Sequence, residues 1–471
     1  MNLAGKINGF FIRFFPSTFT ISVILTFLTF VLAAIFTDPV NIETSANSIY
    51  SDIISDPLSK SNNHFAQLAG FWYQGMWNTG MLAFTVQMML ILVLGYVMAA
   101  TSGFQNIIRK VLAYCSNTAK SAFLVALITL LVSFFNWGLG LIFGALFARK
   151  VAEYAQTNKI SLNYPLIGAA GYSGLMVWHG GISGSAPLKV AEAGHLKALT
   201  GLDLAPITFN QTIFSGMNLT VSLLLITLVP ILLYYLGKKN PGEKLLQLED
   251  QKSIKVQSHD TPTEGAEKID RSRWVSLIIG MLIMMIAILK AIKTGNAGII
   301  DPNYLNFILL GLGLTFSANI SSFLGNVKNA MGAAGGILIQ FPLYFGIMGI
   351  MKYSGMVEIF SGFLMNISNV ETFPLFTFLS AALVNIFVPS GGGQWAVQGP
   401  IIIEAAQNLG IPLGKAVMAL AYGDQITNML QPFWALPLLG ITGLKAGQII
   451  PYTLLLLCLG FVIFLFGIIV F

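Results

Sequence analysis

Charged side chains are scarce in this chain: Asp, Glu, Lys and Arg together make up 9% of its 471 residues, whereas apolar side chains make up 55%. So few charges could not cover the surface of a soluble domain, which excludes an ordinary soluble globular protein. The mean hydropathy of +0.76 indicates instead a polytopic membrane protein in contact with lipid. The net charge of +6 is explained by basic loops that orient membrane spans, and we expect no nucleic acid partner.

Residues that carry chemistry are also few. Cys115 and Cys458, the two cysteines, cannot form a disulfide framework or a zinc site, and the four histidines are widely scattered. The sequence has no Walker A motif, which argues against an ATP-driven pump, and no nucleophile elbow. We therefore expect neither an enzyme nor a bound cofactor, and a secondary carrier is the most natural class.

Nine apolar runs of about 20 residues predict membrane-spanning helices, so the predicted fold class is all-α. The first run follows a basic flank and is long for the core of a signal peptide, so we interpret it as a span. The predicted spans cover residues 17–36, 80–100, 164–188, 216–236, 274–293, 304–322, 334–352, 414–438 and 449–470.

Two further apolar stretches, 121–148 and 371–403, each contain a break at the centre. Basic residues flank both ends of the first stretch, and glutamates flank both ends of the second. Like charges favour ends on the same side of the membrane, so we predict two re-entrant hairpins. Alternatively, each stretch is a long tilted helix or a pair of ordinary spans; for 121–148, a helix that rises about 1.5 Å per residue could cross obliquely.

With two re-entrant hairpins the chain crosses the membrane nine times, and an amino terminus inside places 18 of the 25 Lys and Arg residues on the cytoplasmic side. A polar segment, 237–273, is predicted to be a cytoplasmic linker between two apolar halves. Each half has a broken hairpin, a polar loop, an interrupted span and a plain closing span. An odd number of crossings separates the hairpins, so we predict two repeats of inverted topology, 1–236 and 274–471, the second with an extra span.

The break of the second hairpin lies in "VNIFVPSGGGQWAVQGPIII" at 384–403. Non-helical backbone at membrane depth persists only where protein, water or a ligand satisfies its peptide groups. Glycines leave the backbone accessible, and the amides at a helix start carry partial positive charge, which suits a carboxylate. Alternatively, the glycines only permit a tight turn. The candidate substrate-binding residues at the two breaks are Asn136, Trp137 and Gly138, and Ser390, Gly391, Gly392, Gly393 and Gln394.

Asp424 is the strongest single signal in the interrupted spans. A charge near the bilayer centre costs about 2.5–3.5 kcal/mol, so this carboxylate should face a cavity, a cation or a partner. Thr427 and Asn428 lie one turn further on and are candidates for substrate binding. Asp424 and Asn428 are also candidate ligands of a Na⁺ ion, with a proton site as the alternative. In another interpretation, Asp424 lies near the outer interface or caps the helix break.

The other interrupted span, 164–188, contributes His179 and Ser183 as candidate binding residues. His179 could titrate near neutral pH or donate a hydrogen bond to an anion, or it could be a satisfied buried histidine. Trp178, Trp395 and Trp434 could form the wall of a pocket for an alkyl chain, or they could anchor the chain at the membrane interface.

Four segments resemble a known family: "NIFVPSGGGQWAVQGPIIIEAA" at 385–406, "ALAYGDQITNMLQPFWALPLLG" at 419–440, "FFNWGLGLIFGALFARK" at 134–150 and "SSFLGNVKNAMG" at 321–332. In these segments the sequence resembles the short-chain fatty acid transporter family, of the type associated with acetoacetate and butyrate uptake in bacteria. The resemblance implies a multi-pass carrier of short monocarboxylates in the bacterial inner membrane. It also implies a place in a superfamily of ion transporters that are commonly dimers with an elevator-like motion.

The hairpin tips depart from that superfamily, which often has Ser-Asn-Thr tips, whereas the tips here read Asn136-Trp137-Gly138 and Ser390-Gly391-Gly392. We expect a carboxylate to dock between the two tips while Na⁺ or H⁺ near Asp424 offsets its charge. The expected partners are this substrate, membrane lipid and a second copy of the chain. The alternatives are a carrier of dicarboxylates or amino acids, which needs a second charge partner, and a Na⁺/H⁺ exchanger that works through Asp424 and His179.

Overall fold

The computed structural model describes residues 16–42, 53, 55–101, 110–200, 203–242, 265, 267–294 and 302–471. Every regular element among these residues is a helix, as the sequence predicts. Seven of the described helices are long and apolar enough to cross a membrane. They are α2 (Thr18–Phe36), α4 (Thr79–Ala100), α6 (Thr118–Phe135), α11 (Gly216–Lys239), α13 (Arg273–Thr294), α15 (Ile320–Tyr353) and α21 (Ala446–Val470).

Six of these helices coincide with predicted spans, and α6 is the first arm of the first predicted hairpin. The bounds predicted for the span 304–322 are wrong. Helix α14 (Pro302–Phe316) ends earlier, and Asn319 caps a new helix by accepting a hydrogen bond from the Ser322 amide at 2.8 Å. That new helix is α15, which also contains the span predicted at 334–352. With 34 residues it is about 50 Å long, more than a bilayer core requires.

Both predicted hairpin stretches are broken where the sequence indicates. Helix α6 ends at Phe135 and α7 (Trp137–Thr157) starts after Asn136. Helix α17 (Phe373–Phe387) is separated from α18 (Gly391–Asn408) by three residues that include Pro389. In each pair the two arms pack against one another.

The two interrupted spans are also broken. The first consists of α8 (Tyr164–Tyr172), a 3₁₀ turn η2 (Ser173–Met176) and α9 (Ser185–Ala191). The second consists of α19 (Leu413–Thr427) and α20 (Pro432–Thr442).

Short helices complete the described chain: α3 (His64–Met76), α10 (His195–Thr200), η3 (Phe209–Gln211), α12 (Glu267–Asp270) and α16 (Met356–Asn366). The sequence interpretation missed α3 and α16, because 13 and 11 residues are too few for a search based on runs of about 20.

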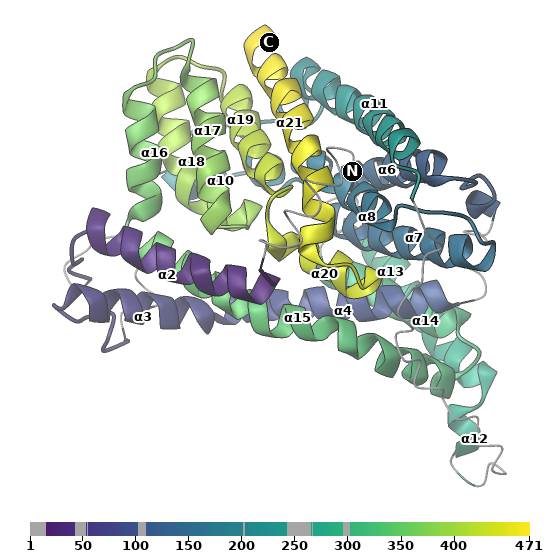
Figure 1. Ribbon diagram of the computed structural model, residues 1–471. Helices are drawn as coiled ribbons and strands as arrows, with labels where there is room; N and C mark the ends of the chain where they lie inside the picture. Colours follow the sequence, from purple (N-terminus) through teal and green to yellow (C-terminus); the bar gives the residue numbers. More distant parts are fainter. Residues whose placement is uncertain are drawn as a thin grey trace.

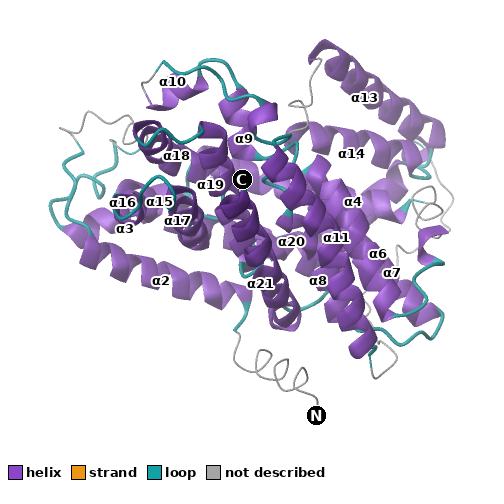
Figure 2. Ribbon diagram, turned by 90° about the horizontal axis from the view of Figure 1, so that it is seen from above, coloured by secondary structure: helices purple, strands orange, loops and turns teal. Residues whose placement is uncertain are grey.

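The helices form three groups (Figure 1). Helices α2, α3, α4 and α15 run side by side along one edge of the molecule, at the bottom of the view, and α14 packs on α4. Above them lie α16 to α19 on one side and α6, α7, α8 and α11 on the other. Seen from above, α21 lies between these two groups (Figure 2), where it contacts both α11 and α19. The broken helices of both halves therefore face each other across the centre.

Close helix packing at the centre depends on glycines beside two tyrosines. A Cβ on Gly171, which precedes Tyr172 in α8, would lie 2.4 Å from the carbonyl oxygen of Gly144 in α7. A Cβ on Gly423, which follows Tyr422 in α19, would lie 2.2 Å from the carbonyl oxygen of Phe378 in α17. In each half, the interrupted span approaches a hairpin arm so closely that only glycine fits.

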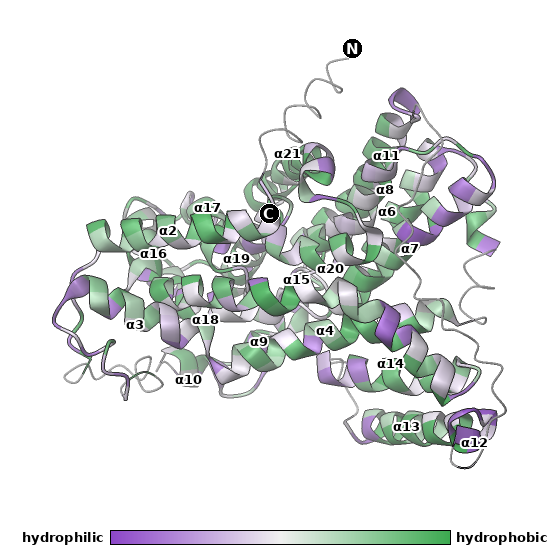
Figure 3. Cartoon of the chain, turned by 60° about the horizontal axis from the view of Figure 1, so that its bottom comes forward, coloured by the Kyte–Doolittle hydropathy of each residue, from purple (hydrophilic) through white to green (hydrophobic). Residues whose placement is uncertain are grey.

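The outer surface is apolar, as a lipid environment requires. Figure 3 shows apolar residues along the outward-facing helices α2 and α13. Ile278, Leu282 and Ile292 of α13 are among the exposed large hydrophobic side chains. In water such a surface would aggregate, so the structure is that of a polytopic membrane protein.

Candidate functional site

The first hairpin tip is fastened to the break of its own half. Asn136 caps α7, since its Oδ1 accepts a hydrogen bond from the Leu139 amide at 2.9 Å. The Trp137 amide donates to Ser183 Oγ at 2.9 Å, and the Ile182 amide donates to the Phe134 carbonyl at 2.8 Å. Two predicted binding residues, Trp137 and Ser183, are therefore brought together, but they bond to each other. Gly138 is buried in the first turn of α7.

The second tip is built differently. Ser390 caps α18, and its Oγ accepts a hydrogen bond from the Gly393 amide at 3.2 Å. The amides of Gly391 and Gly392 belong to the first turn, whose N–H groups have no acceptor within the helix. Gln394 does not face the tip, because its Nε2 donates to the Ala381 carbonyl at 2.8 Å, between the arms of the hairpin.

Gly391 is the point at which the second tip touches the interrupted spans. A Cβ at this position would lie 2.6 Å from Cη2 of Trp178, 2.9 Å from Cε1 of His179 and 3.3 Å from Oδ2 of Asp424. A Cβ at Gly392 would meet nothing within 4 Å. Of the three consecutive glycines, it is therefore Gly391 that allows the close approach to Asp424.

Asp424 and His179 form a buried pair, although the sequence suggested them separately. Nδ1 of His179 contacts Oδ2 of Asp424, and the two residues are 0% and 1% exposed. Nε2 of His179 accepts a hydrogen bond from the Ala186 amide at 3.1 Å, so the ring proton lies on Nδ1, toward the carboxylate. The His179 amide donates to Oε1 of Gln425 at 2.9 Å, which fixes this break against α19. The carboxylate thus has the partner that a charge at this depth requires.

The oxygens suggested as cation ligands surround an amide that the sequence interpretation missed. Nδ2 of Asn385, which has two hydrogens to donate, lies within hydrogen-bonding distance of the Asp424 carbonyl at 2.6 Å, Thr427 Oγ1 at 2.9 Å and Asn428 Oδ1 at 2.9 Å. Asn385 thereby links α17 to the break that follows α19. The available signal was an amide within an apolar run, four residues before Pro389.

Two tyrosines connect each half to the break of the other. The hydroxyl of Tyr172 donates to the Asn428 carbonyl at 2.7 Å. The hydroxyl of Tyr422 donates to Oδ1 of Asn218 at 3.1 Å, and Nδ2 of Asn218 donates to the Gly180 carbonyl at 2.8 Å. Neither tyrosine was predicted as a site residue, because the contact depends on how the two halves face each other.

Aromatic rings cover this polar cluster. The centroid of Trp137 lies 6.0 Å from that of Trp178 and 5.2 Å from that of Trp434, and Trp178 stacks on His179 at 4.4 Å. Trp395 lies elsewhere: its Nε1 donates to Nε2 of His195 at 3.0 Å. The aromatic groups that could meet an alkyl chain are therefore Trp137, Trp178 and Trp434.

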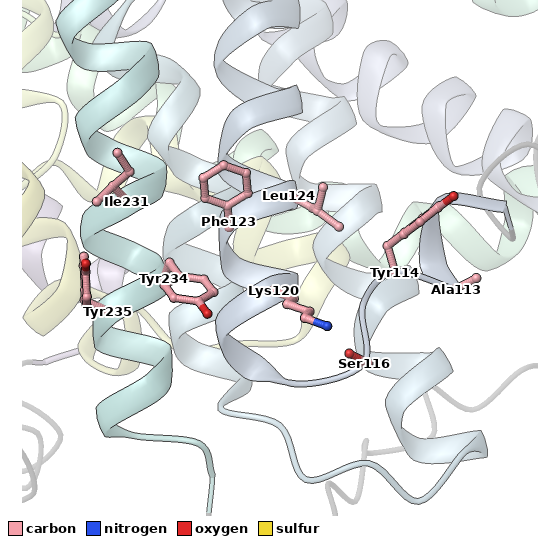
Figure 4. Close-up of a pocket in the computed structure, with 9 residues that line it drawn as sticks. All are labelled: Ala113, Tyr114, Ser116, Lys120, Phe123, Leu124, Ile231, Tyr234 and Tyr235. Atoms are coloured by element: carbon pink, nitrogen blue, oxygen red, sulfur yellow. The ribbon is translucent and has the colours of Figure 1, made fainter.

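A cavity of about 640 Å³ lies away from this cluster, between α6, α11 and the segment before α6 (Figure 4). It is bordered by Tyr114, Lys120, Tyr234 and Tyr235, all far from the helix breaks along the chain. None of the predicted binding residues lines it. This cavity is therefore distinct from the site formed by the breaks.

An all-helical membrane protein with opposed helix breaks around a buried carboxylate belongs to the class of polytopic transporters. The profile of one family, described as "Short chain fatty acid transporter", matches residues 2–471. The chain belongs to this family, which confirms the resemblance noted in the sequence, and it is a transporter and not an enzyme.

Two curated relatives are provisionally named short-chain fatty acid transporters. The relative from Escherichia coli K12 is 35% identical over 479 residues and covers 100% of both chains. The relative from Haemophilus influenzae is 34% identical over 464 residues, which are 97% of this chain and 96% of the relative.

Two solved transporter structures are also similar to the chain, with lower sequence identity than these relatives. The YdaH transporter of Alcanivorax borkumensis has a TM-score of 0.41 and 15% identity, with 97% of each chain covered. MtrF of Neisseria gonorrhoeae, whose structure is described under antimetabolite efflux pumps, has a TM-score of 0.37 and 14% identity, with 96% of this chain and 95% of its own covered.

Proposed function

We propose that the chain is a secondary active carrier of short-chain monocarboxylates such as acetoacetate and butyrate, coupled to Na⁺ or H⁺. It works by alternating access in the bacterial inner membrane, with the amino terminus inside, as a homodimer. The observation that carries the proposal is the contact of Gly391, at the start of α18, with the His179–Asp424 pair. Family membership supplies the substrate class.

Re-entrant hairpins are supported by the contacts at their open ends. Oγ1 of Thr118, at the start of α6, accepts a hydrogen bond from the Asn163 amide at 3.1 Å, just beyond the end of α7. Phe373 at the start of α17 and Ala406 near the end of α18 belong to one buried apolar cluster. In each stretch the two arms also pack against one another, which a straight oblique helix could not achieve.

Inverted repeats are supported by the positions of these open ends along α11. Thr118 Oγ1 donates to the Pro241 carbonyl at 2.7 Å, just beyond the carboxyl end of α11. Gly414, just after the second hairpin, packs against the Gln211 carbonyl, near the amino end of α11. A helix of 24 residues is about 36 Å long, so the hairpins open at opposite ends of a membrane-length helix.

The second tip suits a small carboxylate. The first-turn amides of Gly391 and Gly392 supply N–H donors and the positive end of the helix dipole. Trp178 lies beside the same tip and offers an apolar face to a short alkyl chain. The charged group at this tip is the carboxylate of Asp424, so a cation must offset the combined charge of carboxylate and substrate.

The coupling cation binds at Asp424. A proton is one candidate cation, because the Asp424 carboxylate is buried and has only the His179 ring as its side-chain partner among the described residues. The carbonyl of Asp424 and the side-chain oxygens of Thr427 and Asn428 are oxygen ligands for Na⁺ if the Asn385 amide turns away. Rocking or sliding of the hairpins past α15 would then expose the site alternately.

Counterflow of labelled butyrate in proteoliposomes tests the proposal. Vesicles loaded with unlabelled butyrate should transiently concentrate the labelled compound, and the protein-free vesicles that report passive leak should not. Sodium and pH gradients imposed separately identify the coupling ion. Failure of butyrate and acetoacetate to support counterflow, with cation flux present, would favour an exchanger instead.

Asp424→Asn is the informative variant for coupling. We expect it to insert normally and to lose the dependence of uptake on the cation gradient, because the neutral amide has no negative charge to bind the coupling cation. Uptake of labelled butyrate with and without the gradient measures this. Unchanged cation-coupled uptake would remove Asp424 from the mechanism.

A further inference from the structure

The cavity between α6 and α11 has a polar end and an apolar end (Figure 4). Lys120 and Ser116 lie at one end, and Phe123, Leu124 and Ile231 line the part that continues along the helices. A site of about 640 Å³ with one ammonium, the hydroxyls of one serine and three tyrosines, and an apolar floor has the chemistry to hold an amphipathic molecule with an anionic head.

The polar end is positively charged. Lys110 and Lys120 are exposed near the start of α6, and Lys238 and Lys239 are exposed in the last turn of α11. Neither segment of the chain here, 110–124 or 228–242, contains an Asp or Glu. The hydrogen bond between Thr118 Oγ1 and the Pro241 carbonyl holds the two helix ends at the same level. Lys120 lines the cavity, and Lys238 and Lys239 of α11 add positive charge near this end.

The apolar end continues onto the outer face of α11. Leu223, Ile231 and Tyr235 are 66%, 38% and 58% exposed and are spaced at multiples of four residues, so they share one face. Phe123 and Tyr234 contact each other edge to face at 6.5 Å and form the floor between the two helices. A long acyl chain would lie along this stripe, whereas a small soluble anion would leave it uncovered.

We propose that this cavity binds an anionic phospholipid, with the headgroup phosphate at Lys120 and Ser116 and an acyl chain along Phe123, Leu124 and Ile231. Tyrosines and lysines at the end of membrane helices are typical of the interface, where anionic headgroups lie. The lipid joins the base of the first hairpin to α11. It is independent of the substrate site, because none of the residues at the helix breaks lines the cavity.

The test compares lipids on the purified full chain. Native mass spectrometry in mixed micelles counts bound phosphatidylglycerol against phosphatidylcholine of the same acyl chains. Wild type should prefer phosphatidylglycerol, and Lys120→Gln should reduce the preference about fivefold, as expected for one basic residue near a charged headgroup. Lys445→Gln is the matched control: Lys445 is exposed and does not line the cavity. It should keep the wild-type preference.

A second variant addresses the apolar end. Leu124→Trp should fill the cavity and reduce binding of both lipids, without the change in preference expected for Lys120→Gln. Thermal unfolding of each variant without added lipid checks that it is folded. Equal preference for the two lipids in wild type, or an unchanged preference in Lys120→Gln, would overturn the proposal. So would protection against unfolding by glycerol 3-phosphate equal to that by phosphatidylglycerol, because a soluble phosphate would then be the ligand.

Discussion

The two hairpin tips occupy corresponding places in the two halves, yet they are held in opposite ways. At the first tip the Trp137 amide donates to Ser183, so the break of the same half consumes the donor. At the second tip Gly391 approaches the Asp424 carboxylate without a side chain, and the early amides of α18 have no acceptor within the helix. In the proposed mechanism the two tips therefore have different roles: the first is a fixed support, and the second binds the substrate.

Gly391→Ala should have the largest effect on transport. The added methyl group would overlap Trp178 and His179, and such overpacking typically costs about 1–3 kcal/mol. We expect butyrate counterflow to fall about 10- to 100-fold while the protein still inserts. Gly392→Ala is the matched control, because its methyl group enters open space. Equal loss in both variants would show that the glycines serve the turn and not the contact.

Hydropathy and local composition predicted much of this architecture. Six spans and all four helix breaks follow from runs of apolar residues and from the Gly, Pro and Asp residues that interrupt them. The bounds of α14 and α15 were missed because a search for apolar runs passed over the polar residues around Asn319, which caps the start of α15.

Pairings between the halves were not predictable from one sequence. His179 of the first half and Asp424 of the second are 245 residues apart. Each residue is unusual for its own span, so the sequence marks it as a candidate. Which candidates meet depends on how α8 and α19 pack against the hairpins. Local periodicity in the sequence does not encode this packing.

Ser183→Ala should have the next largest effect, through the fixed tip. It leaves the Trp137 amide, in a partly buried contact, without its acceptor, and an unsatisfied donor costs about 1–3 kcal/mol when it is buried. Ser390→Ala removes only a helix cap, worth about 1 kcal/mol. The midpoint temperature of thermal unfolding should therefore be lower for Ser183→Ala than for Ser390→Ala. Ser183→Thr keeps the hydroxyl and should restore the wild-type midpoint. The reverse order would assign the supporting role to the second tip.

Tyr172→Phe and Tyr422→Phe test whether the halves are equivalent outside the tips. Each removes one buried hydroxyl that reaches the break of the other half, directly or through Asn218, and each should cost about 1 kcal/mol. Denaturant or thermal unfolding in detergent measures the loss. Tyr73→Phe, at an exposed tyrosine, should leave stability unchanged. A loss confined to one of the two buried positions would argue against inverted repeats with matched contacts.

The smallest effect should come from a pH-sensitive contact on the arm of the second tip. Trp395 of α18 donates to Nε2 of His195 in the loop helix α10, and burial, with a contribution from Lys189, lowers the pKa of His195. The neutral ring is the form that accepts this bond, so its contribution to stability is complete above the ordinary pKa of about 6.5 and is lost as the pH falls through the lowered value. Exchange of the backbone amide hydrogens of α10 should therefore be faster at mildly acidic pH than at neutral pH. Trp395→Phe, which has no N–H to donate, should give fast exchange at both values. If wild-type exchange, corrected for its intrinsic pH dependence, does not change with pH, the His195 contact does not hold the arm of the second tip.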